Sequence, residues 1–363
     1  MFWETLWALV LGFGISALVQ VFVSKEQMAN ALGRSGLREV AFATIFGAAS
    51  SSCSYAATSA ARAAFSKGAA LVPVLAFMFA STNLVFELGA VLWVFLGWTF
   101  VLAEVIGAFA LIAIMWLIVR LTLPKGLADE ARAHAQSIEE QSCHGSHERS
   151  CCGSNDDNHA MQPSQSRWAS VASAFFMEWS MLWKELITGF LIAGFAMVLV
   201  PAEWWRGLFL TGGPAGLRLI ENAIVGPIIA VGSFVCSVGN IPLASLLWSH
   251  GISFGGVISF IYADLIIVPL LLIYRKYYGL RAAAYISIVL FVSMVLSGIA
   301  VDLLFAGLGL IPDRAIAMGP MQHASFAWNY TTWLNIAAMV LVVALVYLRK
   351  TSKHNHSSHS GCC

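Results

Sequence analysis

The chain has 363 residues, of which 59% are hydrophobic and 11% are charged, and its mean hydropathy is +0.78. Soluble domains carry about a quarter charged residues, so this composition excludes an ordinary soluble fold. It predicts an all-α protein that crosses a lipid bilayer several times. The net charge of +1 gives no indication of nucleic-acid binding.

Long, nearly uncharged stretches predict the membrane helices, because about 20 apolar residues are needed to cross the hydrocarbon core. In chain order these stretches are Trp7–Val23, Leu88–Val119, Leu186–Val200, Ala283–Phe305 and Trp333–Tyr347. Together with the cysteine-containing segments between them, they predict about eight to ten membrane segments.

A polar segment divides the chain into two membrane halves. Residues 124–168 are rich in charged residues, Ser, Gln and Asn and show no usable hydrophobic pattern, which predicts a partly disordered linker that orders on binding. The expected domains are a first membrane repeat (1–123), this linker (124–168), a second repeat with a last helix (169–348) and a tail (349–363).

The two membrane halves are related by an internal repeat. A shift of 183 residues aligns 50–85 with 233–268 without a gap. Apolar sequences also match by chance, but recurrence of Cys, Ser and Gly at the same spacing favours a duplication. Duplicated transporters form their substrate sites at the repeat interface from interrupted helices. The matched pairs include Cys53 with Cys236, Ser54 with Ser237, Ala61 with Ala244, Ser66 with Ser249, and Gly68 with Gly251.

The sequence around each repeated cysteine is too rich in small residues for a lipid-facing helix. The segments are Gly47–Ser54 and Gly226–Pro242. Gly and Pro interrupt membrane helices where the protein satisfies the freed backbone groups, whereas small residues also allow tight helix packing. We expect a broken helix or a re-entrant hairpin in each segment, with a plain packing seam as the alternative.

Basic residues predict the orientation in the inner membrane, because loops rich in Lys and Arg stay in the cytoplasm. This places Met1 outside, the linker and the C-terminus in the cytoplasm, and the two repeats in opposite orientations. The residues used are Lys25, Arg34, Arg38, Arg62, Lys67, Arg275, Lys276, Arg281, Arg349, Lys350 and Lys353.

The linker and the tail are rich in metal-binding side chains. Thiolates and imidazoles together suit Zn(II), and thiolate-rich pairs suit Cu(I). The spacing matches no closed structural site, which favours labile capture of ions in the cytoplasm; residues without a role are the alternative. The candidates are Cys143, His144, His147, Cys151, Cys152 and His159 in the linker, and His354, His356, His359, Cys362 and Cys363 in the tail.

A second candidate metal site lies within the membrane, where Cys53 and Cys236 occupy equivalent positions. Two thiols from broken helices would form a low-coordinate Cu(I) site or part of a Zn(II) site. A lone buried cysteine is more often a small hydrophobic residue, but the repetition favours a functional pair.

Polar residues in apolar segments complete the expected substrate pathway, since such residues are costly in a membrane and usually functional. Asp264 or Glu104 is expected to carry protons in exchange for metal, or Asp264 to add a ligand. A carboxyl that caps a helix or pairs with a neighbouring helix is the alternative. The pathway residues are Cys53, Ser54, Asn83, Glu104, Cys236, Ser237, Asn240 and Asp264.

These motifs resemble the two-repeat permease family that includes the organoarsenical efflux permeases called ArsP. The resemblance rests on Ser-Ser-Cys53-Ser with Ser-Lys-Gly68, on Phe-Val-Cys236-Ser with Asn240-Ile-Pro242 and Ser-His-Gly251, and on Ala-Asp264-Leu-Ile. The Cys- and His-rich linker and tail resemble the copper/zinc efflux branch of that family. The first repeat has Thr58-Ser59 where the family commonly has prolines. The resemblance implies a bacterial inner-membrane permease without an ATP-hydrolysing domain.

The sequence therefore predicts a secondary exporter of Cu(I) or Zn(II), not an enzyme, with no permanently bound cofactor. The expected partners are the metal ion, the lipid bilayer and a cytoplasmic metal chaperone. No Gly-x-x-x-x-Gly-Lys-[Ser/Thr] stretch occurs, so an ion gradient or the metal gradient would supply the energy. Efflux of trivalent organoarsenicals or arsenite by the same thiols, and a metal sensor without transport, are the alternatives.

Overall fold

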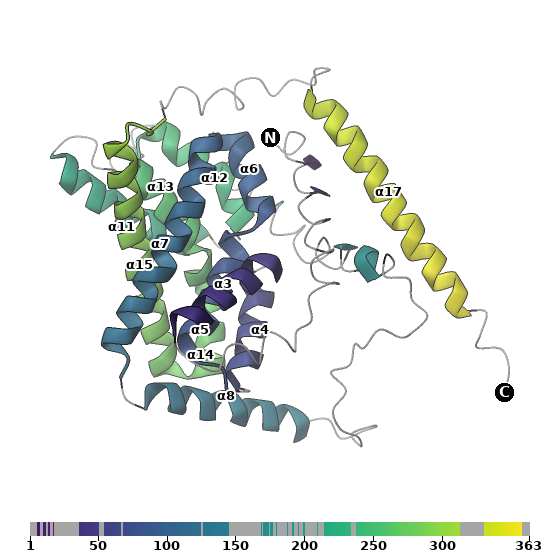
Figure 1. Ribbon diagram of the computed structural model, residues 1–363, viewed down its shortest axis with the longest axis horizontal. Coiled ribbons are helices and arrows are strands. Elements are labelled where there is room, and N and C mark those ends of the chain that lie inside the picture. The colour runs from purple at the N-terminus through teal and green to yellow at the C-terminus, as the bar shows by residue number, and fades with distance from the viewer. Residues whose placement is uncertain are drawn as a thin grey trace.

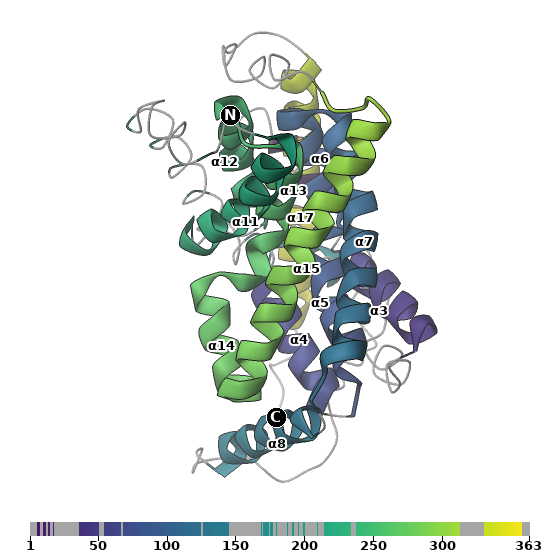
Figure 2. The ribbon, with the colours of Figure 1, turned by 90° about the vertical axis from the view of Figure 1, so that its left-hand side faces the viewer.

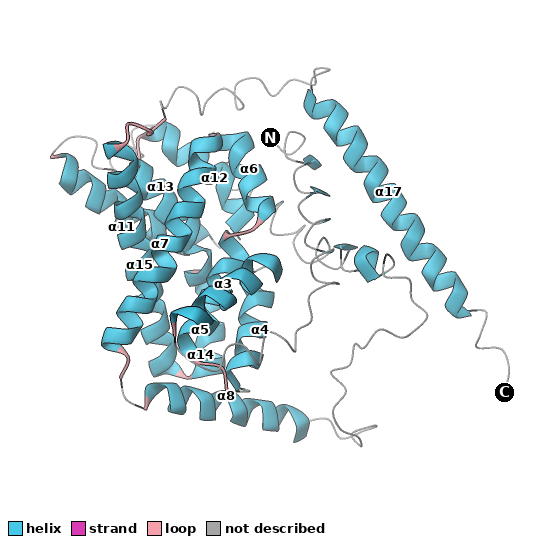
Figure 3. Ribbon diagram, in the orientation of Figure 1, coloured by secondary structure: helices cyan, strands magenta, loops and turns pink. Residues whose placement is uncertain are grey.

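The computed structural model describes residues 36–50, 54–66, 68–124, 126–144, 214–233, 237–312 and 330–357, and isolated residues within 6–17 and 168–209. The described elements are helices, and no strand occurs among them, as Figure 3 shows. This confirms the all-α membrane fold.

The helices of the two halves follow one another in the same order. The first half contains α3 (Leu37–Ser50), α4 (Ser54–Ser66), α5 (Leu71–Asn83), α6 (Phe86–Leu96) and α7 (Trp98–Thr122). The second contains α11 (Ala215–Ser233), α12 (Ser237–His250), α13 (Phe254–Ile261), the 3₁₀ helix η1 (Tyr262–Ile266), α14 (Val268–Tyr278) and α15 (Leu280–Gly307). Between and after the halves lie α8 (Leu127–His144) and α17 (Tyr330–Ser357).

A shift of 183 residues superimposes these helix boundaries within two residues, except that α11 begins five residues before the position equivalent to the start of α3. The backbone agrees in detail, because Gly68 and its counterpart Gly251 have φ values of 106° and 113°. Glycine is suited to this left-handed conformation because it has no Cβ. The duplication inferred from spacing is therefore also present in the backbone.

The two repeats run in opposite directions, as the equivalent helices α7 and α15 show. The Thr122 hydroxyl at the end of α7 lies 3.0 Å from the Tyr285 hydroxyl near the start of α15. Nearer the start of α7 and further along α15, Ser297 Oγ donates to the carbonyl of Gly107 at 2.7 Å. Equivalent helices that pack antiparallel identify an inverted repeat, which is typical of secondary transporters. Figures 1 and 2 show α7 descending to α8 while α15 rises beside it.

The helices α3 and α4 form a re-entrant hairpin. They have 14 and 13 residues, too few to cross a bilayer. Leu37 at the start of α3 lines a cavity together with Arg120 near the end of α7, and Phe65 near the end of α4 contacts Arg132 of α8. Both outer ends therefore lie on the α8 side, as a re-entrant hairpin requires. Its turn, residues 51–53, lies outside the described residues.

The helices α11 and α12 form the corresponding hairpin from the opposite side. Arg218 near the start of α11 interacts with Asp302 near the end of α15, and Trp248 near the end of α12 packs on Phe100 at the start of α7. The turn, residues 234–236, also lies outside the described residues. The expected hairpins are thus present in both repeats.

Each repeat also contains a bent span. The helices α5 and α6 meet at 47°, and the α13–η1 segment meets α14 at 44°. Among the described residues, α7 and α15 are the two helices that are long and apolar enough to cross a membrane individually, and the bent pairs raise this number to four. The total of eight to ten segments includes residues outside the described ranges and stays a prediction.

The expected continuous helix over Leu88–Val119 is wrong. The structure divides it at Gly97, whose φ of 89° ends α6 before α7 begins. Hydropathy cannot detect this corner because both sides of it are apolar. The expected helices over Ala283–Phe305 and Trp333–Tyr347 are confirmed within α15 and α17.

The Gly- and Pro-rich segments also contribute tight packing. Pro227 and Pro242 lie inside α11 and α12, so the two helices of this segment separate between the prolines and not at either of them. A Cβ added at Gly47 would lie 2.6 Å from the Phe77 carbonyl of α5, and one at Gly226 would lie 2.5 Å from the Gly256 carbonyl of α13. The glycines let each hairpin pack directly against the neighbouring bent span.

Replacing Gly226 with alanine should therefore destabilise the protein by about 1–3 kcal/mol, because the new methyl group meets backbone that cannot yield. Gly232→Ala in the same helix is the control, since no atom of the described residues lies within 4 Å of its added Cβ. Thermal unfolding in detergent should show a lower Tm for Gly226→Ala only. Equal Tm values would mean that α11 does not pack on α13 in this way.

The start of the polar linker forms a docked helix, α8, where no usable hydrophobic pattern was expected. Leu127, Ala131 and Ala135 recur every fourth residue and are buried. Alanines make this face too small to stand out among the surrounding polar residues. Figures 1 and 2 show α8 lying across one end of the bundle.

The end of the bundle that carries α8 is rich in basic residues, and we call it the basic end. At the opposite end the described helices carry Arg218. α17 ends on the same side as α8 (Figure 1), and its Asn335 Oδ1 accepts a hydrogen bond from the backbone N–H of Trp7 at 2.9 Å. The basic residues of this end are Arg38, Arg62, Arg120, Arg132, Arg275, Lys276 and Arg281.

Candidate functional site

Asp264 lies at the centre of the bundle, where the bent span of the second repeat meets the hairpin of the first. Its side chain is fully buried in the short η1 helix. Ser54 Oγ donates to its Oδ2 at 2.8 Å, and Asn83 Nδ2 donates to its Oδ1 at 3.3 Å. Asp264 thus joins the start of α4 to the end of α5, both from the other repeat.

The hydrogen bonds continue to the second hairpin. Asn83 Nδ2 also donates to Thr82 Oγ1 at 2.9 Å, and the Thr82 carbonyl accepts a long 3.5 Å hydrogen bond from Ser237 Oγ. We call Ser54, Thr82, Asn83, Ser237 and Asp264 the central polar cluster. It links the first residue of α4 to the first residue of α12, and each of these serines directly follows a repeated cysteine in the sequence.

The pseudo-twofold axis of the repeats passes beside this cluster. Phe79 and Tyr262 are equivalent residues, and their rings pack edge to face with centroids 5.2 Å apart. The Tyr262 hydroxyl donates to the backbone carbonyl of Glu104 at 2.7 Å. Tyr262 was not among the residues predicted for the site. Its position in the first repeat is occupied by the apolar Phe79, so the tyrosine hydroxyl in the second repeat could have indicated a polar contact.

Glu104 is a second buried carboxyl near the cluster. It is 2% exposed and interacts electrostatically with Asp264. Both of its carboxyl oxygens, and Oδ1 of Asn83, lack a hydrogen-bond partner among the described residues. Buried oxygens without donors are uncommon and are suited to binding a cation or carrying a proton. Asn240, also fully buried, lies about one turn after Ser237 in α12.

The structure therefore brings together Ser54, Asn83, Ser237 and Asp264 and places Glu104 next to them. Cys53 and Cys236 lie outside the described residues, so their joint role as metal ligands stays a prediction. No group of three or more His, Cys, Asp or Glu side chains that could hold a metal ion is found where the chain is described.

In the described part of the chain, the structure does not place the metal-binding candidates of the linker and tail next to this cluster. Cys143 and His144 end α8, and His354 and His356 lie in the last turns of α17. The other candidates are outside the described residues: His147, Cys151, Cys152, His159, His359, Cys362 and Cys363.

Aromatic side chains of the two repeats pack on each other near both ends of the bundle. At the basic end, Phe65 packs on Tyr278 with ring centroids 5.5 Å apart, and the Arg62 guanidinium lies 4.6 Å from the centre of the Tyr277 ring. At the opposite end, Trp248 packs on Phe100 with centroids 5.4 Å apart. The cluster residues themselves are at most 7% exposed, so they are buried in this conformation.

Comparison with known proteins supports a transport role for this arrangement. No solved structure matches the chain. The chain is 43% identical over 337 residues to the Mycobacterium tuberculosis protein named "Putative permease Rv2963", an alignment that covers 89% of this chain and 79% of the relative. The model of the ArsP_1 family, described as "Predicted permease", matches residues 1–303. The chain therefore belongs to the ArsP_1 permease family and is a multi-pass membrane transporter.

Proposed function

We propose that this permease exports a soft, thiol-binding metal ion, Cu(I) or Zn(II), through a site formed by the central polar cluster and the two cysteines that precede it. One observation carries the proposal: the hydrogen-bonded chain from Ser54 to Ser237 crosses the repeat interface and joins the two residues that directly follow Cys53 and Cys236.

The chemistry of the cluster supports a cationic cargo. Two thiolates bind Cu(I) or provide half of a tetrahedral Zn(II) site. Asp264 adds a negative charge, which a cation would balance in a medium where an isolated charge is costly. Ser54 and Asn83 hold this carboxylate by hydrogen bonds, so that it is positioned before the cargo arrives.

The distribution of charge supports export from the cytoplasm. Basic residues gather at the α8 end of the described bundle, and the positive-inside tendency assigns that end to the cytoplasm of a bacterial inner membrane. The helices α8 and α17 both lead into the Cys- and His-rich segments on this side. These segments would capture the ion, or accept it from a cytoplasmic metal chaperone, before it enters the bundle.

The inverted repeat supports an alternating-access mechanism. Such transporters expose one site to each side in turn when one part of the protein rocks against the other. Glu104 is the group that we assign to coupling, because a buried carboxyl without a hydrogen-bond partner among the described residues can take up and release a proton as the cluster fills and empties.

Flux into proteoliposomes tests the proposal. Purified protein would be reconstituted with Cu(I), Zn(II) or a trivalent organoarsenical outside the vesicles and a chelating fluorescent reporter inside. Proteolysis of the tail in a parallel sample would give the fraction of chains whose basic end faces outward, and flux would be divided by that fraction. The proposal expects protein-dependent flux of Cu(I) or Zn(II). If the arsenical is transported and neither metal ion is, the cargo that these thiols bind is a metalloid. Binding of metal without flux of any cargo would identify a sensor and overturn the proposal.

A further inference from the structure

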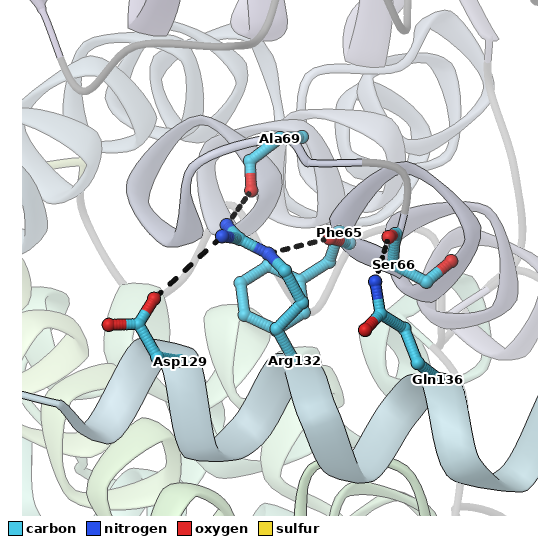
Figure 4. Close-up of polar contacts among 6 residues, drawn as sticks. All are labelled: Phe65, Ser66, Ala69, Asp129, Arg132 and Gln136. Atoms are coloured by element: carbon cyan, nitrogen blue, oxygen red, sulfur yellow. Dashed lines mark hydrogen bonds and ion pairs between the residues drawn. The ribbon is translucent and has the colours of Figure 1, made fainter.

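The helix α8 is firmly attached to the first repeat. Arg132 Nε donates to the Phe65 carbonyl at 3.3 Å and its Nη2 to the Ala69 carbonyl at 3.0 Å, while its guanidinium lies 5.0 Å from the centre of the Phe65 ring. Gln136 Nε2 donates to the Ser66 carbonyl at 3.0 Å. Figure 4 shows both side chains reaching from α8 to the end of α4.

These bonds have a structural cause at the end of α4. The last carbonyls of a helix have no partner within the helix, and an arginine can satisfy several of them while its charge complements the negative end of the helix dipole. Arg132 therefore caps the last turn of α4 at Phe65 and also binds the loop that follows at Ala69. Asp129, on the preceding turn of α8, lies 3.9 Å from its guanidinium.

α8 also packs on α14 and α15 of the second repeat, but its polar contacts there are fewer and more exposed than those to the first repeat. His134 Nε2 lies 3.2 Å from the Lys276 carbonyl at an exposed position. Arg281 and Glu130 form an ion pair at 3.9 Å, with side chains 82% and 61% exposed. Exposed ion pairs contribute little because water screens them. α8 therefore packs on the junction of α14 and α15 without the buried side-chain hydrogen bonds that tie it to α4.

The same place holds aromatic contacts between the two repeats. Phe65, which Arg132 covers, packs on Tyr278 of the second repeat, and Arg62 lies over Tyr277. Opening the site toward the basic end must separate these pairs, since they connect the two repeats. The contacts of α8 with Lys276 and Arg281 span the same seam.

We propose that α8 is a latch that moves with the first repeat, and that the site opens toward the basic end when α8 separates from the α14–α15 junction. The closed latch is the conformation of this structure. Its release leaves the bonds of Arg132 and Gln136 intact and breaks the contacts of His134 and Glu130. The inference rests on the rocking of repeats in the proposed function, but not on the identity of the cargo.

Photocrosslinking from two positions of α8 tests the latch. p-Benzoylphenylalanine would replace His134, which faces the second repeat, or Gln136, which faces the first. Each reconstituted variant would be assayed with Cu(I), Zn(II) and the trivalent organoarsenical before and after illumination, and mass spectrometry would identify the tethered peptide. A tether from position 134 to residues 274–281 should reduce flux in proportion to the crosslinked fraction. A tether from position 136 to residues 62–70 should leave flux unchanged.

The outcomes separate the latch from the proposed function. Absence of flux of every cargo in the unmodified protein would contradict the proposed function itself. Undiminished flux with position 134 tethered would overturn the latch, and so would loss of flux with position 136 tethered, because α8 would then not travel with the first repeat.

Hydrogen exchange on the unmodified protein provides a second readout that does not depend on the substitutions. When Cu(I), Zn(II) or the organoarsenical is transported, exchange in 276–283 should speed up while 62–70 stays protected. Equal changes in both segments, or none in either during measurable flux, would contradict the latch.

Discussion

Replacement of Cys53 or Cys236 with serine should reduce flux of the transported ion by roughly 100-fold or more, since loss of even an outer-shell partner of a metal ligand costs about 10–100-fold. Serine keeps the size of the side chain and removes the soft donor, so the Tm should change little. The measurement is initial flux in proteoliposomes at matched protein density. Cys143→Ser is the comparison, because it removes a thiol of the cytoplasmic capture segment without altering the repeat interface; its loss of flux at saturating ion concentration should be much smaller.

The pair provides an internal check through the repeat. Cys53 and Cys236 are equivalent by the 183-residue shift, so both serine variants should fail to a similar extent, and the double variant should be little worse than either. Nearly normal flux in either single variant would remove that thiol from the pathway and leave the cluster without its soft ligands.

Asp264→Asn should reduce flux by about 10–100-fold through loss of the charge that positions the cargo. The amide has the same shape and can still bond to Ser54 and Asn83 after rotation, so the fold should be retained. Asp264→Ala should also lower the Tm, because it leaves the buried Ser54 hydroxyl without its acceptor, at a cost of about 1–3 kcal/mol; Asn83 Nδ2 would keep its bond to Thr82 Oγ1.

Asp302→Asn is the matched control for the carboxylate. Asp302 accepts the Gly255 N–H at 2.7 Å at the other end of α13, so its neutralisation should leave flux close to normal. If both asparagine variants transport equally well, Asp264 has a structural role only, as a carboxyl that connects α4 to α5. If both asparagine variants lose flux, transport depends on the carboxylates of the second repeat in general and not on Asp264 in particular.

The sequence was sufficient to predict the architecture because the duplication preserves spacing. The repeat was predicted from matched pairs such as Cys53 with Cys236 and Gly68 with Gly251. The structure confirms it, and both of these glycines have the left-handed conformation. Loop charges gave the opposite orientation of the halves, which the antiparallel packing of α7 and α15 bears out.

The bends were not predictable in the same way. The break after Asn83 follows Ser81-Thr82-Asn83, and the break before Val268 lies between Asp264 and Pro269, but polar residues and prolines also occur inside unbroken membrane helices. Each bend instead depends on contacts with the other repeat, such as the bond from Asn83 to Asp264. Tertiary contacts between residues 181 positions apart leave no local pattern.

The site was only partly visible from the sequence for a related reason. Ser54, Asn83, Ser237, Asp264 and Glu104 stood out as polar residues in apolar segments. Their hydrogen-bonded order did not, because it requires the hairpins of both repeats to meet. The docking of α8 was hidden because Arg132 and Gln136 bond to backbone carbonyls, which have no sequence signature.

The central claim is that one soft ion binds where the two repeats meet, and metal binding to the purified protein tests it most directly. The linker and tail ligands would first be replaced, with Cys143, Cys151, Cys152, Cys362 and Cys363 as serines and the neighbouring histidines as alanines. The account predicts one Cu(I) or Zn(II) bound per chain in equilibrium dialysis, lost on Cys53→Ser or Cys236→Ser and weakened on Asp264→Asn. No bound ion, or binding unaffected by these three substitutions, would contradict it.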